Sequence, residues 1–228
     1  MFLTCCNKIK WRKMGWGALI TFVLVLAGVL FLDQPLFLFL RDFNGWICSL
    51  FNNVFSAHVW IIFATIVLGV LCAKKILKSE IKFKNERNHF DLVLFVRNTF
   101  NAVKTSHAFL IFCSVLSAGI IVKILKIFIG RARPVFFEAL GMTGFYPPSL
   151  DWAFNSMPSG HTTVTFAGLV MIGMLAPRYK PLTWTLAILV GLSRVAYGAH
   201  WPSDVLLGVF IGMVIADIVK YLILGRQK

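Results

Sequence analysis

The chain has 228 residues, of which 58% are hydrophobic and 14% are charged, and its mean hydropathy is +0.80. So few polar residues cannot cover a soluble domain of this size, so the composition excludes a disordered chain and favours an all-α integral membrane protein. The net charge of +14, from 23 Lys and Arg against 9 Asp and Glu, suggests that the protein binds either nucleic acid or anionic lipid. The positions of the basic residues along the chain decide between these two partners.

Six apolar segments recur along the chain, each close to the length that a membrane-spanning helix needs. A hydrocarbon core about 30 Å thick takes about 20 residues of helix. The pattern predicts a bundle of six transmembrane helices in a single domain, residues 1–228, with spans at residues 15–32, 59–73, 108–129, 162–175, 182–197 and 205–224. The first span follows basic residues, as a signal peptide does, but it is longer and lacks an A-x-A cleavage site, so we expect it to be retained.

The basic residues are concentrated on one side of this bundle. Four precede the first span, eight lie between the second and third spans, two between the fourth and fifth, and three near the C-terminus, which is 17 of the 23. Lys and Arg accumulate in cytoplasmic loops, so this distribution predicts both termini inside, N-in and C-in. The positive charge therefore indicates membrane topology, and no nucleic-acid partner is expected.

Three connecting segments are rich in aromatic residues. Residues 33–58 would lie outside and residues 74–107 inside, and in both we expect stretches along the membrane surface, because aromatic rings favour the headgroup level. The role of residues 74–107 is left open. Residues 135–155 would lie outside and, with residues 33–58, shape a headgroup site.

Three clusters of polar residues border the apolar segments, where ionisable side chains are costly and usually functional. They are residues 126–134 at the end of the third span, residues 158–161 at the start of the fourth, and residues 193–204 between the fifth and sixth. The parity of the spans places all three clusters on the external face. We therefore predict a single site at that face, within residues 126–204.

The first and third clusters carry cations that predict an anionic ligand. Lys126, Arg133 and Arg194 would bring three positive charges to one pocket, and the guanidinium fork suits phosphate oxygens. Ser159 and Gly160 would open a helix, so their backbone N–H groups would offer a phosphate seat at the positive end of the helix dipole.

Two histidines and a carboxylate complete the predicted site. His161 and His200 can act as nucleophile or proton carrier near neutral pH. Asp204 lies four residues after His200, just inside a helix that Pro202 would begin. There its carboxylate could accept the proton of one imidazole nitrogen and leave the other nitrogen free to attack.

The cysteines add no metal site to this picture. They show neither a CxxC pair nor metal-ligand spacing, so we expect reduced thiols and neither a metal nor another cofactor. The five are Cys5, Cys6, Cys48, Cys72 and Cys113. Palmitoylation of the first two near the membrane is a hypothesis that the sequence leaves open.

Together the three clusters resemble the signature of the type 2 phosphatidic acid phosphatase superfamily, membrane lipid phosphatases related to vanadium-dependent haloperoxidases. The motifs of that family are K-x6-RP, PSGH and SR-x5-H-x3-D, and all three are complete, in order and correctly spaced between Lys126 and Asp204. The matched stretch covers roughly the C-terminal half of the chain, and the six-span layout fits the family.

The resemblance implies a role for each residue. His200 would attack phosphorus and form a phosphohistidine, Asp204 would orient it, and His161 would protonate the leaving group and then activate water. Arg131 would be an additional phosphate or headgroup contact, unless it simply snorkels to the headgroups. The phosphoryl oxygens would be held by Lys126, Arg133, Ser159, Gly160 and Arg194.

The activity that the resemblance implies is metal-independent hydrolysis of a lipid phosphomonoester or pyrophosphate by water, at the periplasmic face of a bacterial inner membrane. The G-R-A-R-P element at residues 130–134 and the compact length look most like enzymes for lipid A or undecaprenyl pyrophosphate. Phosphatidylglycerophosphate and phosphatidate are alternative substrates. A non-catalytic lipid-binding or transport protein is an alternative of another class, although transporters more naturally show broken helices or paired repeats. The sequence determines neither the lipid nor the oligomeric state.

Overall fold

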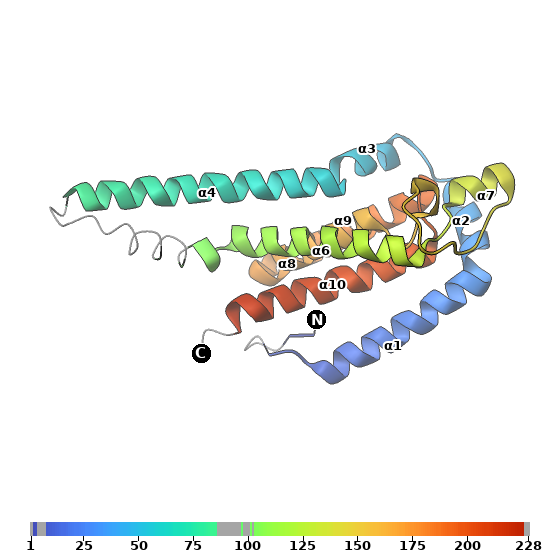
Figure 1. Ribbon diagram of the computed structural model, residues 1–228, viewed down its shortest axis with the longest axis horizontal. Coiled ribbons are helices and arrows are strands. Elements are labelled where there is room, and N and C mark those ends of the chain that lie inside the picture. The colour runs from blue at the N-terminus through green and yellow to red at the C-terminus, as the bar shows by residue number, and fades with distance from the viewer. Residues whose placement is uncertain (1, 4–7, 86–96, 98–100, 102, 226–228) are drawn as a thin grey trace.

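The computed structural model describes residues 2–3, 8–85, 97, 101 and 103–225, which form an all-α structure (Figure 1). Four stretches of the described chain are long and apolar enough to cross a membrane: Trp11–Arg41, Ala57–Lys78, His107–Ile129 and Pro202–Leu224. In chain order the elements are α1 (Trp11–Ala27), the π-helical η1 (Gly28–Leu32), α2 (Asp33–Arg41), α3 (Trp46–Val54), α4 (Ala57–Asn85), α6 (His107–Ile129), α7 (Pro134–Leu140), the 3₁₀ turn η2 (Trp152–Phe154), α8 (Gly160–Leu175), the 3₁₀ turn η3 (Pro177–Tyr179), α9 (Lys180–Ala196) and α10 (Pro202–Leu224).

Each of the six predicted spans lies on a helix, and the all-α membrane class is confirmed. The fourth and fifth predicted spans correspond to α8 and α9, which have 16 and 17 residues. At 1.5 Å per residue these helices are about 24–26 Å long, which is shorter than a hydrocarbon core of about 30 Å. Four spans are therefore supported by length and composition in the described residues, and six spans with N-in, C-in topology remain a prediction.

Two connecting segments differ from their predicted form. Residues 33–41, predicted as part of an external segment, form α2, which follows the first span directly through η1. Pro35 does not prevent this helix, because it lies in the first turn of α2, where its missing N–H is tolerated. Residues 74–85 extend α4 into one helix of 29 residues, since Lys and Glu are good helix formers. Most of residues 86–102 lies outside the described residues, as do Cys5 and Cys6, while Cys48, Cys72 and Cys113 are free thiols.

The centre of the fold is α8, which is buried along nearly its whole length and packs against α6, α9 and α10. Small residues let these helices approach closely, as is usual in membrane bundles. A Cβ at Gly168 would lie 2.9 Å from the Trp60 ring, and a Cβ at Gly212 would lie 2.6 Å from the Thr163 carbonyl oxygen. This close packing fixes the start of α8, where one of the three polar clusters lies.

Substituting Gly212 with alanine is expected to destabilise the protein by about 1–3 kcal/mol, the usual cost of overpacking a core. The added methyl would meet the α8 backbone at Thr163 and the Phe166 side chain 2.8 Å away. Gly69→Ala is the matched control, because its Cβ would meet nothing within 4 Å, and helix propensity should make it neutral or stabilising by up to about 1 kcal/mol. Thermal unfolding in detergent measures both, and equal stability of the two variants would contradict this packing of α8 on α10.

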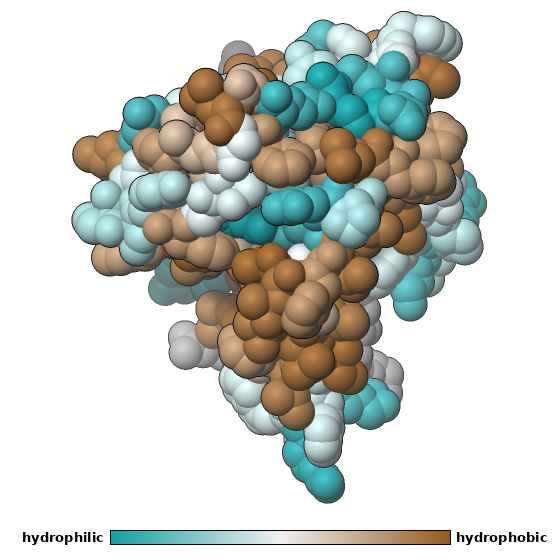
Figure 2. Space-filling model, turned by 90° about the vertical axis from the view of Figure 1, so that its right-hand side faces the viewer, coloured by the Kyte–Doolittle hydropathy of each residue, from teal (hydrophilic) through white to brown (hydrophobic). Residues whose placement is uncertain are grey.

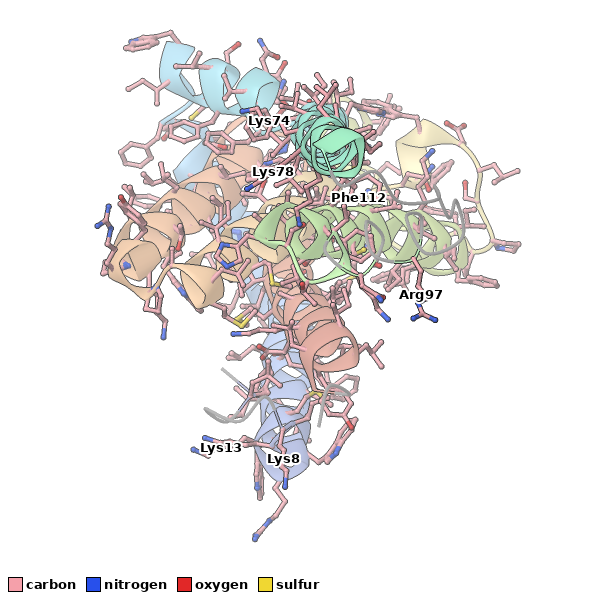
Figure 3. The ribbon with its side chains drawn as sticks, turned by 90° about the vertical axis from the view of Figure 1, so that its left-hand side faces the viewer. Lys8, Lys13, Lys74, Lys78, Arg97 and Phe112 are labelled. Carbon is pink, nitrogen blue, oxygen red and sulfur yellow. The ribbon has the colours of Figure 1, made fainter. Side chains whose placement is uncertain are left out.

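The two ends of the bundle differ in character. The loops that carry the polar clusters gather at the end where α7 and α2 lie (Figure 1). Figure 3 looks onto the other end, which is the left-hand side of Figure 1, and labels the basic side chains of Lys8, Lys13, Lys74, Lys78 and Arg97. The polar clusters and these basic side chains therefore lie toward different ends of the molecule.

Candidate active site

The turn after α6 brings the first motif back over the helix end. Gly130 ends α6 in the left-handed conformation (φ 59°), and a Cβ there would lie 2.6 Å from the Tyr146 carbonyl oxygen, so only glycine fits. A backbone bridge between Arg131 and Phe145 holds the turn. Lys126 in the last turn of α6 and Arg133, the residue before α7, thereby come to the same end of the bundle.

The starts of α8 and α10 are locked together by the second and third motifs. The backbone N–H of Ser159 donates to the Asp204 carbonyl oxygen at 3.0 Å, and the Ser159 hydroxyl accepts from Thr162 Oγ1 at 2.9 Å. Ser159 is fully buried. Its backbone N–H, which was predicted to bind phosphate, instead donates to the Asp204 carbonyl within the protein. Gly160 and His161 follow it into the first turn of α8.

A cavity of about 700 Å³ lies where the three motifs meet. Figure 2 looks onto this end of the molecule, where a hydrophilic patch crosses the face between apolar surfaces. Of the predicted residues, all of which the structure describes, Ser159, Asp204 and Arg131 are outside the lining, and six line the cavity: Lys126, Arg133, Gly160, His161, Arg194 and His200.

The cations of the cavity are held in place by loop carbonyls. Lys126 Nζ donates to the carbonyl oxygens of Asn155 and Ser156, and Arg133 Nε donates to that of Trp152 at 2.9 Å. The Arg133 guanidinium also stacks over the Trp152 ring, 4.3 Å from its centroid. Burial lowers the pKa of Arg133 to about 10, which still leaves it positively charged at neutral pH. These contacts hold the two positive groups in the wall of the cavity.

His200 is almost completely buried, with an exposed fraction of 2%. Burial, and then the positive charges of Lys126, Arg133 and Arg194, lower the pKa of His200 well below its ordinary value, so its imidazole is neutral at neutral pH. Its Nδ1 lies 3.8 Å from Asp204 Oδ2. That distance is too long for a hydrogen bond, although catalytic contacts often tighten only when substrate is bound.

The Asp204 carboxylate is instead occupied by other donors. Asp204 Oδ2 accepts from the Trp201 backbone N–H at 2.9 Å, which caps α10, and from the Ser156 hydroxyl. Asp204 Oδ1 accepts from Arg131 Nη1 at 2.7 Å. Asp204 therefore lies near His200, as predicted, but without a hydrogen bond to it. The hydrogen bonds of its carboxylate fix the start of α10 instead.

Arg131 does not lie where a headgroup contact was predicted. It is only 5% exposed, and its guanidinium joins Asp204 at 2.7 Å to Asp33 at 2.6 Å. Its Nη1 also donates to the Ser203 hydroxyl at 2.6 Å. Two buried carboxylates outcompete lipid headgroups for this side chain, because a buried charge must be paired. Arg131 therefore connects α2 to α10 inside the protein.

Sequence reasoning missed two residues that the fold brings to this region. Asp33 follows the first apolar segment, and a carboxylate at that depth is a signal that it has a partner, although the sequence does not show which one. Asn52 of α3 accepts a hydrogen bond on Oδ1 from Arg194 Nη1, across 142 positions of sequence. No spacing or periodicity in residues 33–58 singles out Asn52.

The fold and the cavity together define a helical membrane protein with a pocket lined by two histidines and three cationic side chains. Residues 107–228 match the sequence profile of the PAP2 superfamily, which is the family of the three motifs. The chain belongs to the PAP2 superfamily, and the predicted family is confirmed.

Relatives with curated names support this placement. The chain is 43% identical over 102 residues to the lipid A 1-phosphatase of Rhizobium etli, which covers 45% of this chain and 44% of that protein. It is 36% identical over 160 residues to the lipid A 1-phosphatase of Rhizobium johnstonii, covering 69% of this chain and 59% of the relative. The matched regions thus span about half the length of these relatives.

A solved structure shows the same fold. The transmembrane PAP2-type phosphatidylglycerolphosphate phosphatase of Bacillus subtilis superposes with a TM-score of 0.58 at 19% identity, covering 95% of this chain and 98% of that chain. At this level of identity the likeness establishes the architecture alone. The similarity extends over the N-terminal helices, which lie outside the matched family region.

Proposed function

We propose that this protein hydrolyses a phosphomonoester or diphosphate on a lipid. The observation that carries the proposal is the convergence of His161, His200, Lys126, Arg133 and Arg194 on one cavity. Cations suited to phosphate oxygens surround a neutral, buried imidazole, which is the arrangement that a nitrogen nucleophile needs. The relatives' name, lipid A 1-phosphatase, favours a lipid A-type substrate.

The proposed reaction has two steps. The neutral His200 attacks phosphorus while Lys126, Arg133 and Arg194 stabilise the charge on the phosphoryl oxygens. A lipid phosphate that binds as its monoanion supplies a proton, which His161 passes to the departing lipid oxygen as the bond from that oxygen to phosphorus breaks. The neutral His161 that results then removes a proton from water, which attacks the phosphohistidine and releases phosphate. Asp204, 3.8 Å from His200 Nδ1, would stabilise the imidazolium that forms.

The apolar walls of the same cavity favour a lipid as the leaving group. Beside the histidines and cations, the lining includes Ala57 and Ile61 of α4 and Leu116 and Ile120 of α6. A lipid tail would lie between α4 and α6 with its phosphate at the cationic end. The basic residues of the opposite half favour an external, periplasmic position for the cavity, by the positive-inside rule.

A substrate panel tests the function and identifies the lipid. The purified protein is given lipid A, undecaprenyl pyrophosphate, phosphatidylglycerophosphate and phosphatidate, and phosphate release is compared by kcat/KM. We expect lipid A to have the highest value and EDTA to leave the rate unchanged, since the mechanism uses no metal. Loss of activity in EDTA would contradict metal independence. Binding of these lipids without any phosphate release would favour the non-catalytic alternative.

A further inference from the structure

One cation of the cavity, Arg194, contacts a helix that lies outside the matched family region. Asn52 lies on α3, which packs against α9. Its side-chain oxygen accepts a hydrogen bond from Arg194 Nη1. A residue of the N-terminal half therefore contacts a cation of the predicted phosphate site.

The contact with Arg194 leaves other donors of the guanidinium available. Arg194 is 4% exposed, and its Nε has no acceptor among the described residues. A buried N–H without a partner is costly, and a phosphate oxygen would satisfy it. A guanidinium held at Nη1 can still offer its Nε–Nη2 edge to phosphate as a two-pronged donor. Asn52 thus holds Nη1 of Arg194, while Nε has no partner in the described residues and Arg194 lines the cavity.

We infer that Asn52 is a positioning residue of this site, which orients Arg194 through its side chain so that α3 completes the phosphate pocket. The inference rests on the proposed function, in that it assigns Asn52 to the same pocket. Asn52 does not touch the reacting atoms, and it acts through Arg194. A site built only from residues 107–228 would lack this support.

The experiment compares two asparagines of the N-terminal half. Inorganic phosphate binding to the full-length protein in detergent is measured by calorimetry for Asn52→Ala and Asn52→Asp, with Asn44→Ala and Asn44→Asp as matched controls, because Asn44 is exposed in the turn between α2 and α3. Asn52→Ala should weaken phosphate binding roughly 10-fold, as expected for one hydrogen bond to a charged group. Asn52→Asp should weaken it further, because a carboxylate on Arg194 repels phosphate. The Asn44 variants should bind like wild type, and all four variants should still unfold in one cooperative thermal transition.

A double-mutant cycle shows whether Asn52 acts through Arg194. In an Arg194→Lys background, Asn52→Ala should cause little additional loss of phosphate affinity, since coupled residues are not additive. In the wild-type background it should also lower kcat/KM, because Arg194 loses its fixed orientation. Additive losses in the cycle, or equal phosphate affinity of Asn52→Ala and Asn44→Ala, would overturn the inference while leaving the proposed function intact. The proposed function would instead be overturned if the wild-type protein bound phosphate more tightly than Asn52→Ala but hydrolysed no lipid phosphate.

Discussion

Replacing His200 with alanine is expected to reduce phosphate release by at least about 10,000-fold, because a covalent mechanism loses its nucleophile. The imidazole is buried at the floor of a cationic cavity, where its pKa is low and its attacking nitrogen stays unprotonated at neutral pH. Phosphate release from the preferred lipid of the panel, in detergent micelles, measures the effect. Thermal unfolding of the variant should remain close to that of wild type, since the substitution removes a neutral side chain.

His107→Ala is the control for this prediction. His107 begins α6, at the opposite end of that helix from Lys126, so its loss should leave kcat/KM within about two-fold of wild type, as for ordinary surface substitutions. A His200→Ala protein that retains wild-type phosphate release would refute the mechanism, even if the substrate assignment were correct. Detection of a phosphorylated His200 in rapidly quenched wild-type enzyme would support it directly.

Replacing Arg131 with methionine is expected to destabilise the protein by about 3–5 kcal/mol, because it leaves two buried carboxylates without their cation. Asp33 and Asp204 lie 2.6 and 2.7 Å from the guanidinium, and neither side chain is more than 4% exposed. The measurement is the free energy of unfolding in mixed micelles. Adding Asp33→Asn to Arg131→Met should recover part of the loss, because it removes one of the unpaired charges.

The ion pair of Arg41 and Glu138 is a matched comparison. Its charged atoms are 3.0 Å apart, and both side chains are about one-third exposed. Arg41→Met should cost only about 0–1 kcal/mol, since solvent screens such pairs. If Arg131 instead served as a headgroup contact, Arg131→Met would raise KM and leave the unfolding free energy unchanged. That result would contradict the buried network described above.

The sequence by itself determined the class of protein and most of the residues of the site. Each of the six apolar runs in the sequence lies on a helix of the described chain, because burial in lipid or protein imposes long apolar runs that are visible locally. The motif spacings placed Lys126, Arg133, His161, Arg194 and His200 at one end of the bundle, because each motif lies at a helix end. The family comparison confirms the family that the motifs indicated.

Only the tertiary structure decided which polar groups reach the cavity and which support it. Ser159 and Asp204 belong to the motifs, yet their hydrogen bonds are to the protein. Arg131 lies two residues from Arg133, but the left-handed turn at Gly130 directs it inward to Asp33.

The partners in these networks are far apart along the chain: 98 positions separate Asp33 from Arg131, and 142 separate Asn52 from Arg194. A local pattern fixes which face of a helix is apolar, since that depends on neighbours three or four positions away. The pairing of a buried charge depends on which distant helix packs beside it, and that is a property of the folded chain. The sequence therefore determined which polar side chains this region contains. The packing of α2, α3 and α10 determined which of them line the cavity and which hold the surrounding helices in place.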